Sequence, residues 1–390
     1  MEEWKTYKLG DLYDVHNGLS KGGQFFGTGF PFLSFSTVFK NYFLPHDLGS
    51  LVQSDEKERL SFDIRRGDVF ITRTSETAEE LGMSSVALID YPNGTYNGFT
   101  KRLRPKEGEA FVIPEYIGYY LRSPRFRRLL YSLSSSMSTR ASLANSDLLN
   151  MEITIPSTNT QKRIADILRS IDNKIELNNR INHNLEEQAQ ALFNDWCSTC
   201  QEKKTIGELA ANILDYSKNT CSKVILVNSS DVTEGKFEAL PYSENENLKG
   251  QFKKRFQKGD ILFSEIRPRN NHYALCYFNA DEYIASTRLI VLRHNANLIG
   301  SSTLLYQYIK SSSVQEGFIA KTESRSGTFP QGNYADLASE EVPYSVDNKQ
   351  LSYLLDGVYK QIWSNLKEND NLVKQRDELL PRLMSGELIC

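Results

Sequence analysis

The feature that most constrains the fold is an internal duplication, because a chain written twice builds one structural unit twice. Four short segments of the first half recur in the same order in the second half: YKLGDLYD (7–14) as KTIGELAA (204–211), RRGDVFITR (65–73) as QKGDILFSE (257–265), GFTKRLRP (98–105) as ASTRLIVL (285–292), and YYLRSP (119–124) as YQYIKSS (306–312). The offset between the copies drifts from 197 to 192 and then to 187 residues. Such drift indicates loop insertions and deletions between two copies of one fold.

Each copy consists of two parts. The first part, 1–158 and again 201–345, has short apolar or alternating runs broken by Gly, Asn, Pro and Ser, which predict strands and turns with one interrupting helical segment. The second part, 159–200 and again 346–390, is almost free of Gly and Pro and predicts a long helix of roughly 60 Å. We therefore expect an α+β fold, with two similar mixed α/β domains that are each followed by a long helix.

Apolar residues in the two long helices recur at alternating steps of 4 and 3, which is the spacing of a coiled-coil seam. The two seams align at an offset of 187 residues. Equivalent helices of this kind can pair antiparallel about a pseudo-two-fold axis. The predicted seam includes Leu168, Ile175, Leu185, Leu192, Leu355, Ile362, Leu372 and Leu379.

Asparagines interrupt this seam twice and in register, at Asn178 and Asn182 and again at Asn365 and Asn369. Antiparallel pairing would set Asn178 against Asn369 and Asn182 against Asn365. Our hypothesis is that these side chains hydrogen-bond across the seam and set its register, since a slip would leave buried amides unpaired at about 1–3 kcal/mol each. Two alternatives are that the asparagines are solvated or that they face a third helix from a partner.

Composition excludes several function classes. The net charge is −3, with 18 Lys and Arg against 19 Asp and Glu in 1–158, and 17 against 17 in 201–345. A nucleic-acid partner would therefore have to be met by local patches or by another subunit. No apolar run approaches the ~20 residues that span a bilayer, and we expect a cytoplasmic protein. The five scattered cysteines, with one CxxC at Cys197 and Cys200, predict no disulfide framework and no metal site.

Two similar domains on a rigid antiparallel spacer would present two related surfaces at a fixed separation. Duplex DNA has local two-fold symmetry, and proteins of matching symmetry read two half-sites at a spacing that their geometry sets. Because the two copies differ in sequence, the half-sites should differ as well. The pattern therefore favours a bipartite, asymmetric DNA target.

The repeated segments resemble, in order, those of the specificity subunit of type I DNA restriction–modification systems. The strings that carry the resemblance cover nearly the whole chain: EWKTYKLGDL at the start, GDVFITR and GDILFSEIRP in the two target recognition domains, ITIPSTNTQKRIADIL and QALFNDW at the ends of the first conserved helix, and ELLPRLMSGEL at the end of the second. One departure lies before each helix, where the Pro-Pro-x-x-Glu-Gln of that family reads PSTNTQK and PYSVDNKQ.

This resemblance implies a non-catalytic subunit that chooses the DNA sequence, with one half-site read by each domain and the spacer set by the helices. It implies double-stranded DNA, two methyltransferase (M) subunits docked on the helices, and endonuclease/translocase (R) subunits as partners. S-adenosylmethionine, ATP and magnesium would bind to those partner subunits, so that this chain is expected to hold no cofactor. Two alternatives stay open: a protein-binding adaptor with two interaction domains on a coiled-coil spacer, and a specificity subunit that serves methylation only.

The sequence contains no Asn-Pro-Pro-Tyr or Asp-Pro-Pro-Phe string for an amino-methyltransferase and no GxxxxGK[ST] phosphate loop. Asp260 and Glu265 in GDILFSEIR resemble the carboxylates of a nuclease site. In the other copy, however, Arg73 stands at the position of Glu265. We therefore interpret Asp260, like Asp68, as a turn residue that enters a strand.

Residues for DNA contact are expected in polar loops at matching places in both copies, since Lys and Arg suit phosphates while Arg, Asn, Ser and Thr suit base edges. The candidates are Lys21, Arg73, Thr74, Ser75, Ser138, Arg140, Lys218, Arg267, Arg269, Asn270, Asn271, His272, Ser324 and Arg325. The basic run at 122–128 is interpreted as a helix that faces either phosphate or solvent. The run KRLRPK at 101–106 is a weaker candidate, because it alternates like a strand edge.

Overall fold

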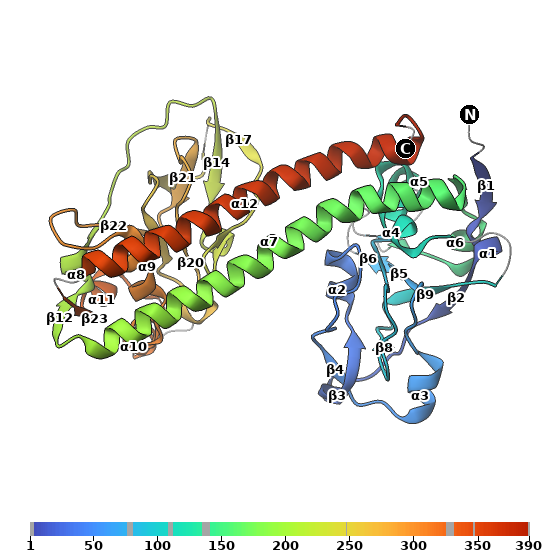
Figure 1. Ribbon diagram of the computed structural model, residues 1–390, viewed down its shortest axis with the longest axis horizontal. Coiled ribbons are helices and arrows are strands. Elements are labelled where there is room, and N and C mark those ends of the chain that lie inside the picture. Colours follow the sequence, from blue (N-terminus) through green and yellow to red (C-terminus); the bar gives the residue numbers. More distant parts are fainter. Residues whose placement is uncertain are drawn as a thin grey trace. The chain divides into compact units, whose positions relative to one another are not determined.

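The computed structural model describes residues 4–75, 81–107, 112–134, 141–246, 248–324, 331–345 and 348–388. Its contacts divide the chain into an N-terminal unit, Met1–Glu176 with Asn369–Cys390, and a C-terminal unit, Leu177–Glu368. The long helices α7 (Thr158–Thr199) and α12 (Asn348–Ser385), green and red in Figure 1, each contribute one part to each unit. The four segments expected from the sequence are thus grouped differently, because each helix packs into the cores of the domains.

The two units contain their elements in a closely similar order. The N-terminal unit has β1 (Lys5–Lys8), α1 (Leu9–Leu12), β2 (Tyr13–Asn17), η1 (Gly23–Phe25), β3 (Phe26–Leu33), α2 (Phe35–Lys40), β4 (Leu51–Val52), α3 (Glu56–Ser61), β5 (Val69–Thr72), β6 (Thr74–Ser75), β7 (Ser84–Val86), β8 (Thr95–Tyr96), β9 (Thr100–Pro105), α4 (Pro114–Arg122), α5 (Pro124–Ser134), β10 (Ala141–Ser142), α6 (Asn145–Asn150) and β11 (Glu152–Ile155). The C-terminal unit has β12 (Glu202–Thr205), α8 (Ile206–Leu209), β13 (Ala210–Asn212), β14 (Lys223–Val227), η2 (Ser229–Asp231), β15 (Val232–Thr233), β16 (Lys236–Phe237), β17 (Tyr242–Glu244), β18 (Phe252–Lys254), β19 (Ile261–Ser264), η3 (Pro268–Asn270), β20 (Tyr273–Leu275), β21 (Tyr283–Ser286), β22 (Leu289–His294), α9 (Ser302–Lys310), α10 (Ser312–Glu323), α11 (Tyr334–Ala338) and β23 (Glu341–Tyr344).

Equivalent sheets form in both units. An antiparallel sheet has the order β2-β9-β5-β7 in the N-terminal unit and β13-β22-β19-β20 in the C-terminal unit. Strands β5 and β19 are the repeated Gly-Asp segments, and every residue of both strands is buried. A second sheet contains one parallel pair in each unit, β3 with β8 and β14 with β21. The predicted α+β fold with two similar mixed domains, each followed by a long helix, is confirmed.

The strand register corrects one predicted match between the copies. Val69 on β5 pairs with Leu103 on β9, and Ile261 on β19 pairs with Leu292 on β22. The equivalent strands β9 and β22 therefore differ by 189 residues, so the match of GFTKRLRP with ASTRLIVL at 187 is wrong by two residues. The similarity of the letters was misleading because the loops before these strands differ in length.

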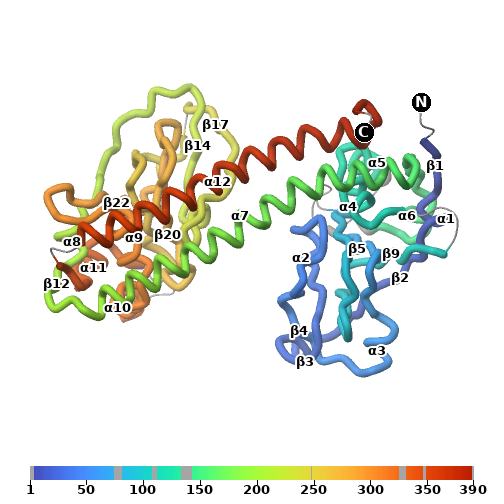
Figure 2. Tube along the Cα trace, viewed as in Figure 1, coloured from blue at the N-terminus to red at the C-terminus, as the bar shows by residue number. Residues whose placement is uncertain are grey.

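Each part of the helix pair is buried in the core of one unit. Leu168 of α7 joins the N-terminal core, where α4 contributes several tyrosines, and Leu355 and Ile362 of α12 join the C-terminal core. Figure 2 shows α12 returning along α7 within the C-terminal unit. Helical stability here comes from the burial of one apolar face in a domain core.

Most predicted seam residues are at least half-buried: Leu168, Leu355 and Ile362 are buried, and Ile175, Leu185, Leu372 and Leu379 are half-buried. The prediction that Leu192 belongs to the seam is wrong, because its side chain is 41% exposed. Its neighbour Phe193 is buried instead, with its ring 5.2 Å from that of Tyr308 on α9. A straight helix drifts by about 20° per heptad relative to a 3.5-residue seam, and at this end α7 follows the packing on α9.

The asparagines are buried, and one of the two predicted pairs is confirmed. Asn365 Nδ2 donates to Asn182 Oδ1 at 2.7 Å, and its own Oδ1 accepts from Gln361 at 2.8 Å. Asn178 Nδ2 donates to Glu368 Oε2 at 2.8 Å. The pairing of Asn178 with Asn369 would join the two units and stays a prediction.

Breaking the Asn182–Asn365 pair should cost more than replacing it. Asn365→Leu leaves the buried amide of Asn182 without its partner, and we expect the free energy of unfolding to fall by about 1–3 kcal/mol. Asn182→Leu with Asn365→Leu replaces both partners by apolar groups, and its stability should lie close to that of the wild type. Denaturation of the three proteins in urea measures this. A double variant as unstable as the single one would contradict the pairing.

Candidate nucleic-acid interface

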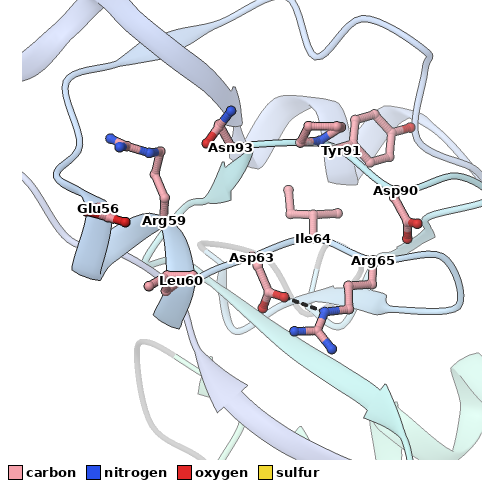
Figure 3. A pocket seen from close by; sticks show the side chains of 10 residues that line it. Glu56, Arg59, Leu60, Asp63, Ile64, Arg65, Asp90, Tyr91 and Asn93 are labelled. Atoms are coloured by element: carbon pink, nitrogen blue, oxygen red, sulfur yellow. Dashed lines mark hydrogen bonds and ion pairs between the residues drawn. The ribbon is translucent and has the colours of Figure 1, made fainter.

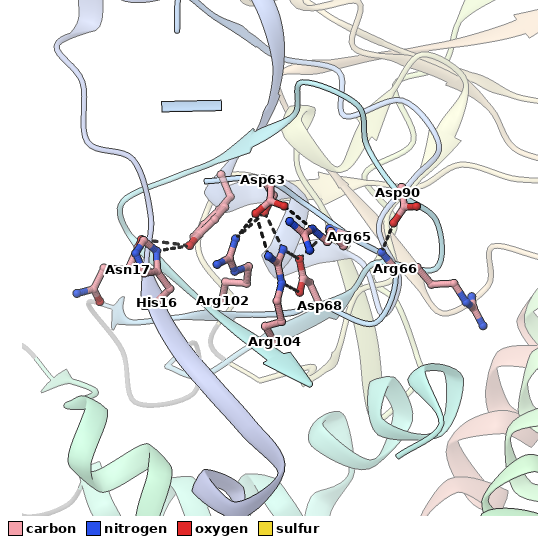
Figure 4. A network of polar contacts seen from close by, with 10 residues as sticks. His16, Asn17, Asp63, Arg65, Arg66, Asp68, Asp90, Arg102 and Arg104 are labelled. Carbon is pink, nitrogen blue, oxygen red and sulfur yellow. Dashed lines mark hydrogen bonds and ion pairs between the residues drawn. The ribbon is translucent and has the colours of Figure 1, made fainter. Parts of the chain in front are cut away.

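A buried aspartate opens the central strand of each unit and holds an arginine of the neighbouring strand. Asp68 accepts from Arg104 Nε at 2.8 Å and Nη2 at 2.6 Å, and Asp260 accepts from Arg293 at 2.7 and 2.8 Å. Each carboxylate also accepts the backbone N–H three residues earlier, at 2.8 Å. Both aspartates are 0% exposed. The interpretation of Asp68 and Asp260 as turn residues is confirmed. Figure 4 shows the contact of Asp68 with Arg104.

Asp63 extends this network and neutralises more of strand β9. Its Oδ1 lies 2.9 Å from Arg102 Nη1 and 3.0 Å from Arg104 Nη1, and its Oδ2 pairs with Arg65 (Figure 4). Burial acts to raise the pKa of Asp63, but the hydrogen bonds and charges of Arg104 and Arg65 outweigh it, so that the pKa lies below the ordinary value. The arginines of the KRLRPK run therefore stabilise the fold through these ion pairs.

In the C-terminal unit, the segment after β19 is a short loop that its neighbours hold on both sides. The backbone N–H of Glu265 donates to Arg288 O at 3.0 Å, and its carbonyl accepts from Gly332 N at 2.8 Å. At the far end of the loop, His272 Nδ1 lies 2.9 Å from Thr233 Oγ1 and 3.1 Å from Val232 O. The predicted residues from Arg267 to His272 thus lie together on a supported loop.

Three residues of this region have left-handed backbone conformations that side chains disfavour. Arg267 has φ 49° and Asn271 has φ 52°, on either side of the turn η3. Glu234, with φ 48°, donates its backbone N–H to Asn271 O at 2.9 Å. Such conformations cost about 1–3 kcal/mol each, persist only where the surroundings enforce them, and gather at functional sites.

The side chains of this loop are presented to solvent. Arg267, Arg269 and Asn270 are exposed. Arg269 forms a two-pronged ion pair with Glu323 at the end of α10, at 2.6 and 2.8 Å, and the next residue, Ser324, is exposed as well. The structure thus brings the predicted residues Arg267, Arg269, Asn270, Asn271, His272 and Ser324 together, while Arg325 lies outside the described residues.

The N-terminal unit repeats this frame with different side chains. The N–H of Arg73 donates to Phe99 O at 3.0 Å, and its carbonyl accepts from Leu143 N at 2.9 Å. Thr74 and Ser75 form β6, which pairs with β10. This pairing places Arg73, Thr74 and Ser75 beside the end of the segment in which Ser138 and Arg140 were predicted, and those two residues lie outside the described residues.

Lys101 was predicted only as part of the weaker candidate run 101–106, but the structure distinguishes it from the arginines of that run. It is 5% exposed, and its ammonium donates to Asn145 Oδ1. Burial, with a contribution from the nearby Arg73, holds the pKa of Lys101 below its ordinary value. Among the described residues neither cation pairs with a carboxylate, and Arg73 Nε is buried without a hydrogen-bond partner. The sequence signal that could have identified Lys101 is the alternation of side chains along a strand, because it places Lys101 on the face opposite to Arg102 and Arg104.

Two predicted lysines lie apart from these loops. Lys21 Nζ donates to Gln53 O at 2.6 Å and lies 2.7 Å from Glu58 Oε2, so its charge is already matched. Lys218 is exposed in the segment before β14.

The prediction that the basic run 122–128 faces either phosphate or solvent is wrong at its first residue. Arg122 faces neither phosphate nor solvent, because it is bound to backbone carbonyls: Ser84 at 2.6 Å, Val38 at 2.7 Å, and Phe39 and Asn41 at 2.8 Å each. Burial lowers the pKa of Arg122 to about 10. This side chain is therefore a structural tie between α4 and the segment around α2.

A cavity of about 420 Å³ beside α3 has Glu56, Arg59, Asp63 and Arg65 among its lining residues (Figure 3). Its acids and bases are mixed, and Asp63 and Arg65 pair with each other. Among the described residues, no cluster of three or more His, Cys, Asp or Glu could hold a metal ion. Glu265, the second proposed nuclease carboxylate, has a pKa raised by burial.

Comparison with known proteins shows what the first half of the chain is similar to. The family model described as "Type I restriction modification DNA specificity domain" matches residues 1–187. Residues 1–187 are thus similar to a type I restriction–modification DNA specificity domain. The predicted resemblance to this family is thereby confirmed.

Relatives of the specificity domain support this conclusion. The chain is 35% identical over 148 residues to the HindI type I restriction enzyme specificity subunit of Haemophilus influenzae, covering 38% of this chain and 31% of that protein. It is 25% identical over 200 residues to the MjaIX specificity subunit of Methanocaldococcus jannaschii, covering 50% of this chain and 44% of that one. The matches thus span about a third to a half of the length of these relatives.

A solved structure shares the fold of the whole chain. The S subunit of a type I restriction–modification system from M. genitalium superposes with a TM-score of 0.57 and 14% identity, over 98% of this chain and 96% of that one. The duplicated architecture around the specificity domain is therefore one that a known S subunit adopts. Within the described parts of the chain, no helix combines the length and the apolar character needed to cross a membrane.

Proposed function

We propose that this chain is the DNA sequence-specificity subunit of a type I restriction–modification complex, and that it recognises a bipartite, asymmetric target. The observation that carries the proposal is the repetition of one loop frame. In each unit the central strand runs into a segment tied by backbone hydrogen bonds to two neighbouring segments, with Arg73 at its start in one unit and Arg267 and Arg269 within it in the other. Each frame would read one half-site.

The charge distribution supports a complex in which partner subunits supply part of the contacts with DNA. The first domain has 18 basic against 19 acidic residues and the second 17 against 17, and several arginines are neutralised inside the sheets. We therefore expect weak binding to DNA by the chain alone, with a shallow dependence on salt. Two methyltransferase subunits docked on α7 and α12 would supply the remaining contacts, and endonuclease/translocase subunits would join this core.

The catalytic role would lie entirely with those partners. S-adenosylmethionine, ATP and magnesium would bind to the methyltransferase and endonuclease subunits, and this chain would hold no cofactor of its own. Its described residues contribute geometry: supported loops, exposed arginines and amides, and helices that attach both domains.

Long-read sequencing that detects methyladenine, in a host with and without the gene, tests the proposal. We expect one motif of two unlike half-sites around a fixed run of unspecified bases to lose methylation on deletion. Exchange of residues 1–158 for those of a related subunit should then change one half-site only. An unchanged methylation pattern in a host that expresses the partner subunits would contradict the proposal and favour a protein-binding adaptor. Lost methylation with undiminished phage restriction would identify a methylation-only subunit.

A further inference from the structure

The loop after β19 holds its arginines in a fixed place. Pro268 is buried, and the N–H groups of Asn270 and Asn271 donate to Arg267 O and Pro268 O at 2.9 and 3.2 Å. The left-handed conformations of Arg267 and Asn271 complete a turn that leaves the backbone little freedom. A competitor for Arg269 would therefore meet its guanidinium group where this supported turn presents it.

Glu323 occupies that guanidinium with both carboxylate oxygens. Arg269 Nε donates to Oε1 at 2.6 Å and Nη2 donates to Oε2 at 2.8 Å. This parallel two-bond geometry is also the one by which arginine binds a phosphate. The Arg269 side chain is 69% exposed and that of Glu323 is 39% exposed, so solvent or a ligand reaches the pair.

The position of Glu323 is not one that helix α10 itself favours. Glu323 is the last residue of α10, where the carbonyl ends of the helix make a negative charge unfavourable. The hydrogen bonds and charge of Arg269 nevertheless hold the pKa of Glu323 below its ordinary value. The carboxylate is therefore stabilised by Arg269 and not by the helix.

The neighbouring cations show that this neutralisation is selective. Arg267, two residues away, is exposed with no side-chain partner among the described residues. In the N-terminal unit, Arg73 and Lys101 likewise pair with no carboxylate in the part of the chain that the structure describes. Among the described residues that follow β5 and β19, Arg269 is thus paired with a carboxylate, whereas Arg267 and Arg73 are not.

We propose that Glu323 is a specificity-determining residue that stands in for a DNA phosphate on Arg269 in the free protein and yields it only to a correctly seated duplex. This inference rests on the proposed function. Non-specific DNA would have to displace the carboxylate or approach its negative charge, and it gains too few other contacts to do so. At the cognate half-site, the contacts of the whole loop would compensate for the displacement.

Binding of the full-length chain to labelled duplexes of unrelated sequence, followed by fluorescence anisotropy between about 50 and about 200 mM salt, tests this inference. We expect Glu323→Gln to bind such DNA about fivefold more tightly, because one repulsive charge is removed and one guanidinium is released. The plot of log affinity against log salt should steepen by about 0.9, the value for one more phosphate contact. In an Arg269→Gln background, Glu323→Gln should add no gain beyond that of the control.

Glu341→Gln is the matched control. It also removes one negative charge from an exposed ion pair, that of Glu341 with Lys203 at 3.3 Å between β23 and β12, and it should change affinity by less than about twofold. If Glu323→Gln and Glu341→Gln bind alike while the wild type binds DNA, the inference is overturned and the proposed function stands. If neither the wild type nor any variant binds DNA at the lowest salt, the inference is overturned as well, and the proposed function is then decided by the methylation pattern alone.

Discussion

Asp68→Ala is expected to lower the free energy of unfolding of the N-terminal unit by about 3 kcal/mol, because it removes the carboxylate that binds a largely buried arginine through two hydrogen bonds. Asp68 is 1% exposed at its side chain, and Arg104 is 24% exposed. The same change also removes the acceptor for the backbone N–H of Arg65. The hydrogen bonds and charges of Asp68 and then Asp63 raise the pKa of Arg104 despite its burial, so the arginine stays charged in the variant and, among the described residues, retains only Asp63 as an acidic partner.

Hydrogen exchange followed by mass spectrometry measures this loss strand by strand. Peptides from β5 and β9 should exchange faster in Asp68→Ala, whereas those from β19 and β22 should keep their protection. Asp90→Ala is the control, since Asp90 is exposed and accepts only the backbone N–H of Arg66 at 2.7 Å, and it should cost about 1 kcal/mol or less. Equal effects of Asp68→Ala and Asp90→Ala would contradict the structural role of Asp68.

Asp172→Ala should weaken the N-terminal unit by a similar amount, about 3 kcal/mol, where the long helices attach to the domain. Asp172 on α7 accepts from Tyr119 Oη of α4 and, at 3.0 Å, from Arg376 Nη1 of α12. The side chains of Arg376 and Asp172 are only 16% and 12% exposed. Loss of the carboxylate leaves a tyrosine hydroxyl and a guanidinium poorly solvated, and chemical denaturation with exchange in α4 and α7 peptides would measure the cost.

Asp377→Ala provides a close control for Asp172→Ala. Asp377 pairs with the same Arg376 at 3.0 Å, but its side chain is 56% exposed, so we expect a loss of at most about 1 kcal/mol. If the two variants were equally stable, the tie between α7, α4 and α12 would carry no appreciable energy. Under the proposed function, Asp172→Ala should also relax the spacing between methylated half-sites, because the N-terminal domain would be held less firmly on its helices.

A carboxylate of α7 also links a domain helix to α12 in the C-terminal unit, but there the tyrosine and the cation come from the opposite partners. Glu186 on α7 accepts from Lys310 of α9 at 2.5 Å and from Tyr359 of α12 at 2.8 Å. In the N-terminal unit the domain supplies the tyrosine and α12 supplies the cation, whereas here α9 supplies the cation and α12 the tyrosine. In both units a carboxylate on α7 is the acceptor.

The duplication, the two long helices and the turn role of the repeated aspartates could be predicted from the amino-acid sequence, because they depend on local periodicity and turn chemistry. The Gly-Asp segments form the buried central strands, and Asn182 meets Asn365, as the heptad spacing predicted. Family resemblance carried by strings such as EWKTYKLGDL could likewise be found in the sequence alone.

Which charges are exposed and which are neutralised could be seen only in the three-dimensional structure, because ion pairs join residues far apart in the chain. Arg122 donates hydrogen bonds to backbone carbonyls, and Arg102 forms an ion pair with Asp63. Arg269 forms an ion pair with Glu323 on a separate helix. The exposure of Leu192 and the register of β22 also depended on packing between elements. Periodicity reports which face of an element is apolar, but the partner of that face, and of each charge, is set by the three-dimensional contacts.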